Sequence, residues 1–248
     1  MLSELLENVT QMKPPQTTKE ANSRKGRVRS VRTRELGWTL LVGLALAVGT
    51  LLAFAALANE MLEGDTQHFD DWIRGAIHQH ASPALTSFMR VVSVLGIPLV
   101  LLTLSVLSAA GFLFARRNRG LFLLVVTMIG AVVLNVVLKS SFQRTRPVPF
   151  FDAFPPSSYS FPSGHALASF CFYSTVAAII SARTRSRVVR IAVWALAALL
   201  ITLIGISRIY LGVHYPSDVL AGYGAAFIWV IMVSLGDRAL KHRASEPG

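Results

Sequence analysis

The chain has few cysteines and few charged residues for its length. Cys171 is the single cysteine among 248 residues, which excludes an internal disulfide framework and any metal site built from several cysteines. Charged residues make up 15% of the chain, whereas soluble domains usually carry about 25%. Hydrophobic residues reach 53%, a content that also argues against intrinsic disorder. The composition therefore disfavours both a disordered chain and an ordinary soluble domain.

Acidic residues are scarce as well. The chain has 13 Asp and Glu against 24 Lys and Arg, which gives a formal net charge of +11. Such an excess is typical of a nucleic-acid-binding protein or of a membrane protein with basic cytoplasmic loops. The positions of the charges along the chain distinguish these two classes.

Six segments are apolar enough, or nearly so, to cross a membrane as helices of about 20 residues. They run over Trp38–Ala58, Val91–Ala115, Leu121–Leu138, His165–Ala182, Ile191–Ile206 and Val219–Leu235. Pro98 is expected to kink the second segment. The first segment follows a long polar stretch, so we expect a retained anchor rather than a cleaved signal peptide. The pattern predicts an all-α integral membrane bundle of six helices.

Six spans would place both chain ends on one side of the membrane. That side would hold 18 of the 24 basic residues. The opposite side would hold Arg74, Arg90, Lys139, Arg144, Arg146 and Arg208. This bias fits the positive-inside rule with both termini in the cytoplasm. The basic surplus is thus assigned to membrane topology, and because no readout element is visible, nucleic acid is not an expected partner.

The same pattern divides the chain into three parts. Residues 1–36 form a basic cytoplasmic tail that is expected to be mobile, apart from a short helix near Leu2–Met12. Residues 37–238 form the six-span membrane domain, and residues 239–248 form a short cytoplasmic tail.

Three blocks of polar residues fall at the non-cytoplasmic ends of spans three to six. They are Lys139-x6-Arg146-Pro147, Pro162-Ser163-Gly164-His165 and Ser207-Arg208-x5-His214-x3-Asp218. A bundle brings such ends together, which predicts three cations, two histidines and one carboxylate at one membrane face. Cations and the start of a helix suit a phosphate anion. One imidazole could then attack and the other donate a proton, with Asp218 orienting His214.

In this order, the three blocks resemble the motifs of the type 2 phosphatidic acid phosphatase superfamily, K-x6-R-P, P-S-G-H and S-R-x5-H-x3-D. Every specified position is filled. The resemblance implies a membrane lipid phosphatase that needs no metal ion and no other cofactor. It implies that His214 forms a phosphohistidine, that Asp218 holds His214 and that His165 protonates the leaving oxygen. The residues implied to bind the phosphate are Lys139, Arg146, Ser163, Gly164 and Arg208.

The implied substrate is a phosphomonoester or diphosphate of a membrane lipid in the bilayer. Candidates are undecaprenyl diphosphate, phosphatidic acid and phosphatidylglycerol phosphate. By analogy, the enzyme would lie in a bacterial inner (plasma) membrane, with its site on the periplasmic or extracellular side. Phosphoryl transfer to a second lipid or sugar remains open. A vanadium-dependent haloperoxidase and an anionic-lipid transporter are disfavoured, the first because those enzymes are soluble and larger, the second because the charges cluster at one face. The sequence predicts no oligomeric state.

Further expectations concern residues outside the motifs. Residues 69–77 have the apolar spacing of an amphipathic helix at the membrane interface. Arg144 is interpreted as peripheral, and Cys171 as a small buried apolar residue. The aromatic stretch Val148–Phe161 is interpreted either as an interfacial belt or as the mouth of the substrate site. Two residues are candidates for hydrogen bonds between helices, Asn135 and Tyr173, and three histidines are expected to be solvated, His68, His78 and His80.

Overall fold

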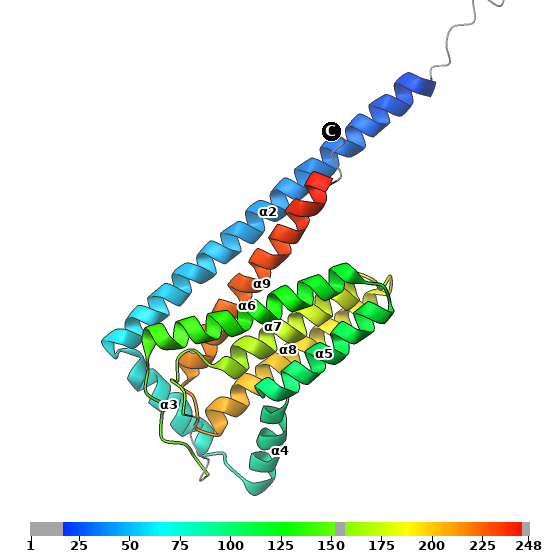
Figure 1. The fold of residues 1–248 in the computed structure, drawn as a ribbon. Helices are drawn as coiled ribbons and strands as arrows, with labels where there is room; N and C mark the ends of the chain where they lie inside the picture. The colour runs from blue at the N-terminus through cyan, green and yellow to red at the C-terminus, as the bar shows by residue number, and fades with distance from the viewer. Residues whose placement is uncertain (1–16, 152–156, 245–248) are drawn as a thin grey trace, which may run out of the picture. The chain divides into compact units, whose positions relative to one another are not determined.

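The computed structural model describes residues 17–151 and 157–244, with side chains over 37–151 and 157–242. Within these ranges the chain is all-helical and contains no strand. The helices are α2 (Thr17–Glu63), α3 (Thr66–His78), α4 (Pro83–Val94), α5 (Pro98–Phe114), α6 (Asn118–Phe142), α7 (Gly164–Ser181), α8 (Arg187–Tyr210) and α9 (Pro216–Ala244) (Figure 1). The chain divides into two compact units, residues 1–45 and residues 46–248. All three motif blocks lie in the second unit.

Five helices in the described part of the chain are long and apolar enough to cross a membrane. They cover Gly37–Glu63, Asn118–Phe142, Gly164–Ser181, Arg187–Tyr210 and Pro216–His242. The expected second span is found as two helices, α4 and α5, which meet at an angle of 49° and qualify only as a pair. Pro98 occupies the first turn of α5, where its missing N–H costs no helical hydrogen bond. The expected kink is therefore a break between two helices, and the protein is a multi-pass membrane protein.

Two helices extend beyond the expected membrane segments. The backbone is helical from Thr17, well before the expected span start at Trp38, and α9 continues to Ala244. Lys, Arg, Glu and Ala are frequent in these extensions, and all four are good helix formers. The short helix expected near Leu2–Met12 lies outside the described residues.

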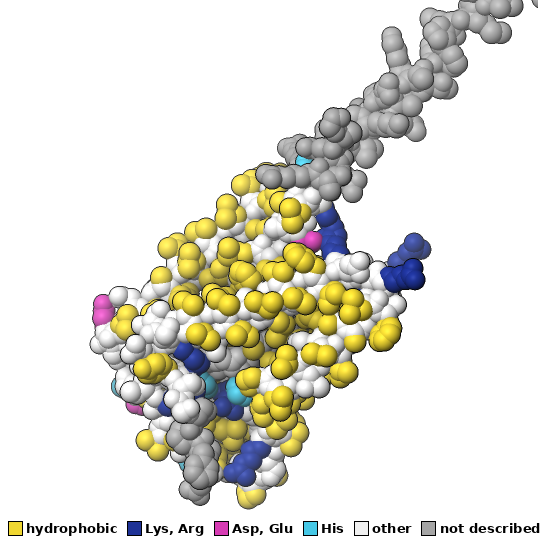
Figure 2. All heavy atoms as spheres, viewed as in Figure 1, with side chains coloured by type: hydrophobic (Ala, Val, Ile, Leu, Met, Phe, Trp, Pro, Cys, Tyr) yellow, Lys and Arg dark blue, Asp and Glu magenta, His cyan; other side chains and the backbone are white. Residues whose placement is uncertain are grey.

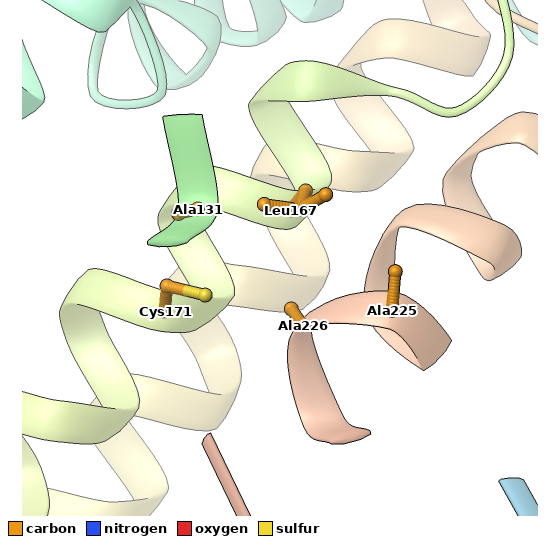
Figure 3. Close-up of a cluster of buried hydrophobic side chains, with 5 residues drawn as sticks. All are labelled: Ala131, Leu167, Cys171, Ala225 and Ala226. Atoms are coloured by element: carbon orange, nitrogen blue, oxygen red, sulfur yellow. The ribbon is translucent and has the colours of Figure 1, made fainter. Parts of the chain in front are cut away.

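Helix α7 is the core of the bundle. In its most apolar stretch 56% of the residues are buried, compared with 6% in the corresponding stretch of α2. This position explains why α7 is short and rich in small and polar residues, because it contacts other helices rather than lipid. Cys171 is fully buried, as predicted. Small side chains allow α6, α7 and α9 to converge around Ala131, Leu167, Cys171, Ala225 and Ala226 (Figure 3).

The outward faces of the helices are apolar. Leu99 and Phe114 on α5 are 70% and 90% exposed, and Figure 2 shows hydrophobic side chains covering the visible face. A soluble protein rarely exposes so much contiguous apolar surface, whereas helices in a bilayer do. At the end of the bundle away from the motifs, Arg119 at the start of α6 pairs with Asp237 of α9.

Helix α3 confirms the amphipathic segment expected over residues 69–77 and shows which face points inward. Phe69 and Trp72 are 45% and 67% exposed, whereas Asp70 is 0% exposed and Arg74 is buried. Both residues lie in the segment expected at the membrane interface, and the burial of their charges was not predicted. The apolar side of α3 faces outward, as expected for a helix at a lipid interface, and its polar side packs on the protein.

One testable consequence concerns the contact between α9 and the start of α7. A Cβ added at Gly222 would lie 2.7 Å from the Ser163 carbonyl oxygen and 3.0 Å from the Ala166 Cβ. We expect Gly222→Ala to push the helices apart and to reduce stability by about 1–3 kcal/mol, the usual cost of overpacking. The measurement is thermal unfolding in detergent.

Gly224→Ala is the matched control for Gly222→Ala. A Cβ at Gly224 meets only ordinary contacts, at 3.8 Å from Thr50 and 3.9 Å from Phe54. This substitution should be neutral or stabilise the helix by up to about 1 kcal/mol. Equal melting temperatures for the two variants would contradict the close contact at Gly222.

Candidate active site

The three motif blocks meet at one end of the bundle. Lys139 lies in the last turn of α6, Ser163 precedes α7, Arg208 ends α8 and Asp218 lies in the first turn of α9. Figure 1 shows that the segment after α6 runs at this end, beside α3. The structure therefore gathers the predicted site residues where four helices end or begin.

The Asp218 carboxylate orients His214. Its Oδ2 atom accepts hydrogen bonds from Ser160 Oγ at 2.5 Å and from the Tyr215 backbone N–H at 2.9 Å, and it lies 3.3 Å from His214 Nδ1. Asp218 is 0% and His214 is 2% exposed. The two residues are at positions i and i+4, and the turn before α9 lets the carboxylate reach back to the ring.

The contact with Arg146 shows which nitrogen of His214 carries the proton. Arg146 Nη1 lies 3.0 Å from His214 Nε2, and an arginine N–H can only donate. Nε2 must therefore be the unprotonated acceptor, so the neutral ring carries its proton on Nδ1 and donates it to Asp218. Burial lowers the pKa of His214 to about 4, although the hydrogen bond to Asp218 opposes this shift. At neutral pH the imidazole is thus uncharged and has a free electron pair on Nε2.

Arg146 and Lys139 both contact the backbone of the segment before α7. Arg146 donates to the carbonyl oxygens of Ser158 at 2.7 Å and Val213 at 2.8 Å, and Lys139 Nζ donates to the carbonyl of Tyr159. Burial lowers the pKa of Arg146, and the Asp218 charge opposes that shift. These cations are held by neutral carbonyl dipoles, so their positive charge is left uncompensated for an anion.

Arg208 and His165 have buried nitrogens without a partner in the described structure. Arg208 donates through Nη1 to Ser93 Oγ at 2.5 Å, whereas its Nε makes no hydrogen bond. His165 Nε2 likewise has no partner. Arg208, His214, Arg146 and Lys139 all lie within electrostatic range of His165. Buried polar atoms are normally paired, so these two nitrogens indicate a site for a polar ligand.

Ser163 and Gly164 form the start of α7. The Ser163 hydroxyl accepts from the Ala166 N–H at 3.5 Å, and its own backbone N–H donates to the Asp218 carbonyl oxygen at 2.9 Å. A Cβ at Gly164 would lie 2.9 Å from Asn135 Oδ1. The absence of a side chain at Gly164 thus accommodates Asn135 of the neighbouring helix α6. The first N–H groups of α7 remain suited to an anion.

Arg144 corrects the sequence analysis, which interpreted it as peripheral. Its side chain is 9% exposed, and Nη1 donates to Asp218 Oδ1 at 2.8 Å. Nη2 donates to Asp70 Oδ2 of α3, also at 2.8 Å. Ser160 was missed as well, because no motif includes it. For Arg144, the only indication in the sequence was its position as a third cation within the Lys139–Arg146 block. For Ser160 the sequence contained no indication.

The aromatic stretch around the site divides into two parts. Phe161 is fully buried and packs against Phe142, while Phe150 stacks on His78 of α3 with ring centroids 4.1 Å apart. His78 is exposed as expected but is held by this stacking. Phe154, Pro155 and Pro156 lie outside the described residues. Tyr173 confirms its expected role by donating to the Leu95 carbonyl oxygen at 3.1 Å, whereas no hydrogen bond is found for the buried Asn135 Oδ1.

The arrangement is suited to bind an oxyanion beside a neutral imidazole. Three cations and the first turn of α7 surround an oriented neutral imidazole, and a second histidine has a free ring nitrogen. Among the described residues, no group of three or more His, Cys, Asp or Glu side chains is placed to hold a metal ion.

Arg208→Gln provides a test of the anion site. Orthovanadate, a tetrahedral phosphate mimic, should bind the wild-type protein and raise its melting temperature in detergent. Arg208→Gln should weaken vanadate binding about 10- to 100-fold, because a hydrogen bond to a charged group contributes about 1.5–3 kcal/mol. Arg90→Gln removes an exposed cation near the same end, which among the described residues bonds only to the Phe151 carbonyl at 3.4 Å, and it should leave binding unchanged. Equal effects of the two substitutions would argue for a diffuse electrostatic attraction instead.

Known proteins are similar to this chain over part or most of its length. A family model described as the PAP2 superfamily matches residues 120–239. Phosphatidylglycerophosphatase B of Bacillus subtilis is 32% identical over 196 residues, which cover 78% of this chain and 96% of that protein. Undecaprenyl-diphosphatase of Sulfolobus acidocaldarius is 33% identical over 116 residues, covering 45% of this chain and 52% of that protein.

Solved structures show the same fold. The crystal structure of a transmembrane PAP2 type phosphatidylglycerolphosphate phosphatase from Bacillus subtilis matches with a TM-score of 0.71 at 31% identity, covering 78% of this chain and 96% of that one. The structure of Aquifex aeolicus LpxE matches with a TM-score of 0.53 at 27% identity, covering 67% and 94%. The family resemblance predicted from the three motifs is thereby confirmed, and the chain belongs to the PAP2 superfamily.

Proposed function

We propose that this protein hydrolyses a phosphomonoester or diphosphate of a membrane lipid through a phosphohistidine formed on His214. The observation that carries the proposal is the orientation of His214: Asp218 holds Nδ1 and Arg146 contacts the unprotonated Nε2. An attacking nitrogen has to present its electron pair toward bound phosphate, and the position now taken by Arg146 Nη1 is where that phosphate would lie.

In the first step His214 Nε2 attacks the phosphorus atom. A nitrogen–phosphorus bond forms, the bond from phosphorus to the lipid oxygen breaks, and His165 donates a proton to that leaving oxygen. Arg146, Arg208 and Lys139 stabilise the charge on the phosphoryl oxygens as it develops. Asp218 stabilises the positive charge that the substituted imidazole acquires.

In the second step water attacks the phosphohistidine. His165 accepts a proton from the water, the nitrogen–phosphorus bond breaks, and inorganic phosphate leaves. Over the two steps His165 gives one proton to the leaving oxygen and regains one from water, so the cycle balances, and no metal ion takes part in it.

The relatives suggest the class of substrate. They are named phosphatidylglycerophosphatase B, undecaprenyl-diphosphatase and lipid A 1-phosphatase, and all three names denote a phosphate group on a lipid. A site at the ends of membrane helices suits a headgroup that its own hydrocarbon chains keep in the bilayer. Phosphatidylglycerol phosphate, phosphatidic acid and undecaprenyl diphosphate are our candidates for this chain.

The proposed placement is the inner (plasma) membrane, with both termini in the cytoplasm and the site on the periplasmic or extracellular side. It follows from counting the α4–α5 pair as one span, which gives six crossings over residues 37–238, between the tails 1–36 and 239–248. The support is the positive-inside bias, because the loop at Arg116–Arg119, the loop at Arg183–Arg190 and the end of α9 are basic.

His214→Ala tests the proposed function. Purified wild-type protein should release inorganic phosphate from a lipid phosphate in the presence of EDTA, and a screen over the three candidate lipids would identify the preferred one. His214→Ala should remove all measurable turnover and keep the wild-type melting temperature. A strict need for a divalent metal, or near-normal turnover by the variant, would contradict the mechanism. Phosphate appearing on an added acceptor lipid instead of in solution would identify a phosphotransferase.

His165→Ala tests the general acid. A leaving group that needs a proton depends on the acid, whereas an activated leaving group such as nitrophenolate does not. General acid catalysis typically contributes about 10²–10⁴-fold. We therefore expect kcat to fall by about that factor for the lipid phosphate and much less for p-nitrophenyl phosphate. Equal losses on both substrates would assign His165 to phosphate binding rather than proton transfer.

A further inference from the structure

Asp70 is a fully buried carboxylate on a helix whose neighbouring side chains face outward. It is 0% exposed, while Phe69 and Trp72 on the same helix are 45% and 67% exposed. Burying a carboxylate is costly unless it is paired and hydrogen-bonded. The buried Asp70 carboxylate therefore needs a specific set of hydrogen-bonding and charged partners.

Those partners connect Asp70 to the proposed active site. Asp70 Oδ2 accepts from Arg144 Nη2 at 2.8 Å and from the Ser217 hydroxyl at 2.5 Å, and Oδ1 accepts from the Ser217 backbone N–H at 2.9 Å. Arg144 Nη1 in turn donates to Asp218 Oδ1 at 2.8 Å and to Ser217 Oγ at 2.7 Å. The guanidinium also lies over the Tyr215 ring, 4.1 Å from its centroid. One planar cation thus bridges two buried carboxylates from α3 and α9.

We propose that Asp70 is a positioning residue that acts through Arg144 and Ser217 to fix Asp218, and thereby the tautomer and orientation of His214. This inference rests on the proposed function, in which His214 is the nucleophile. Asp70 itself touches neither His214 nor the residues that would bind phosphate. Helix α3 thus supplies Asp70, the residue farthest from His214 in this chain of contacts.

The charges explain why a second carboxylate is needed. A lone Arg144 would neutralise Asp218, and the pair could do little for the positive charge on a phosphorylated imidazole. With Asp70 included, the two carboxylates and one guanidinium have a net charge of −1. This charge offsets the groups that oppose protonation of His214, namely Arg146 from the loop and Arg208 from α8. Arg144 can then hold Asp218 rigidly without cancelling its effect on His214.

Asp70→Asn is the direct experiment, with Asp71→Asn as the matched control. Asp71 is adjacent on α3, has a side chain 54% exposed and bonds only to Gln67 and Arg74 among the described residues. We expect Asp70→Asn to lower kcat on the lipid phosphate by about 10- to 100-fold, the loss typical when the outer partner of a functional histidine is removed. KM should stay within about twofold, since no phosphate-binding residue is altered. Asp71→Asn should match the wild type.

The pH profile separates positioning from a merely structural role. Activity requires neutral His214, so kcat/KM falls on the acid side as the ring is protonated. Removing the Asp70 charge makes the surroundings of His214 more positive, so the acid limb should move to lower pH. The limb of Asp71→Asn should not move. A folded Asp70→Asn variant with kcat within about twofold of wild type, or with reduced kcat but an unmoved acid limb, would overturn the proposal.

Ser217→Ala covers the case in which Asp70→Asn fails to fold. It removes only the hydroxyl shared by Arg144 and Asp70. It should therefore lower kcat by less than Asp70→Asn does and leave the acid limb in place, because both carboxylates keep their charge. Nitrogen-15 spectra of histidine-labelled protein at neutral pH, assigned with His214→Ala, give a readout that needs no turnover. The wild type should show His214 protonated on Nδ1, and Asp70→Asn should mix the two tautomers. An unchanged His214 tautomer in Asp70→Asn would contradict the inference. If the wild type released no phosphate, that result would contradict the proposed function but not the role of Asp70 in fixing the tautomer.

Discussion

The buried carboxylate of Asp218 is the interaction on which the rest of the site depends. It is 0% exposed and receives hydrogen bonds from a serine hydroxyl, a backbone N–H and an arginine, with an imidazole in contact. These partners come from the segment after α6 and from the turn before α9. A carboxylate at the end of a membrane bundle is stable only with such a complete set of donors. Satisfying Asp218 therefore folds the loop segments into place and orients His214.

The cations at this end show how a bundle can hold uncompensated positive charge. Lys139 and Arg146 donate mainly to backbone carbonyl oxygens, which satisfy hydrogen bonds without neutralising charge. Paired with carboxylates instead, as Arg144 is, they would have little attraction left for an anion. The site thus separates two kinds of cation: Arg144 is bound between acids and structural, whereas the others are left available for a phosphate group.

Helix α3 links this chemistry to the membrane surface. Phe69 and Trp72 face outward, whereas the buried charges Asp70 and Arg74 face the loops that carry the site. Arg74 donates to the Val148 carbonyl oxygen at 2.8 Å, so the segment after α6 is fixed to α3 at a second point. The same helix can therefore lie in the lipid interface and support the residues that would meet a lipid headgroup.

Much of this arrangement was predictable from the sequence, and the reason is local. The lengths of the hydrophobic segments located the spans, and the bias of the basic residues suggested their orientation. The spacing of the three blocks placed Lys139, His165 and His214 at helix ends. All of these properties follow from the order of residues along the chain. Only the tertiary structure decided the roles of Arg144, Asp70 and Ser160. Each is an ordinary polar residue in its own segment. Arg144 and Ser160 contact Asp218, and Asp70 is connected to it through Arg144, only because segments distant in sequence pack together. A pattern along one chain carries no information about which charge will be paired across space, and that pairing determines which cation is structural and which remains available for a ligand.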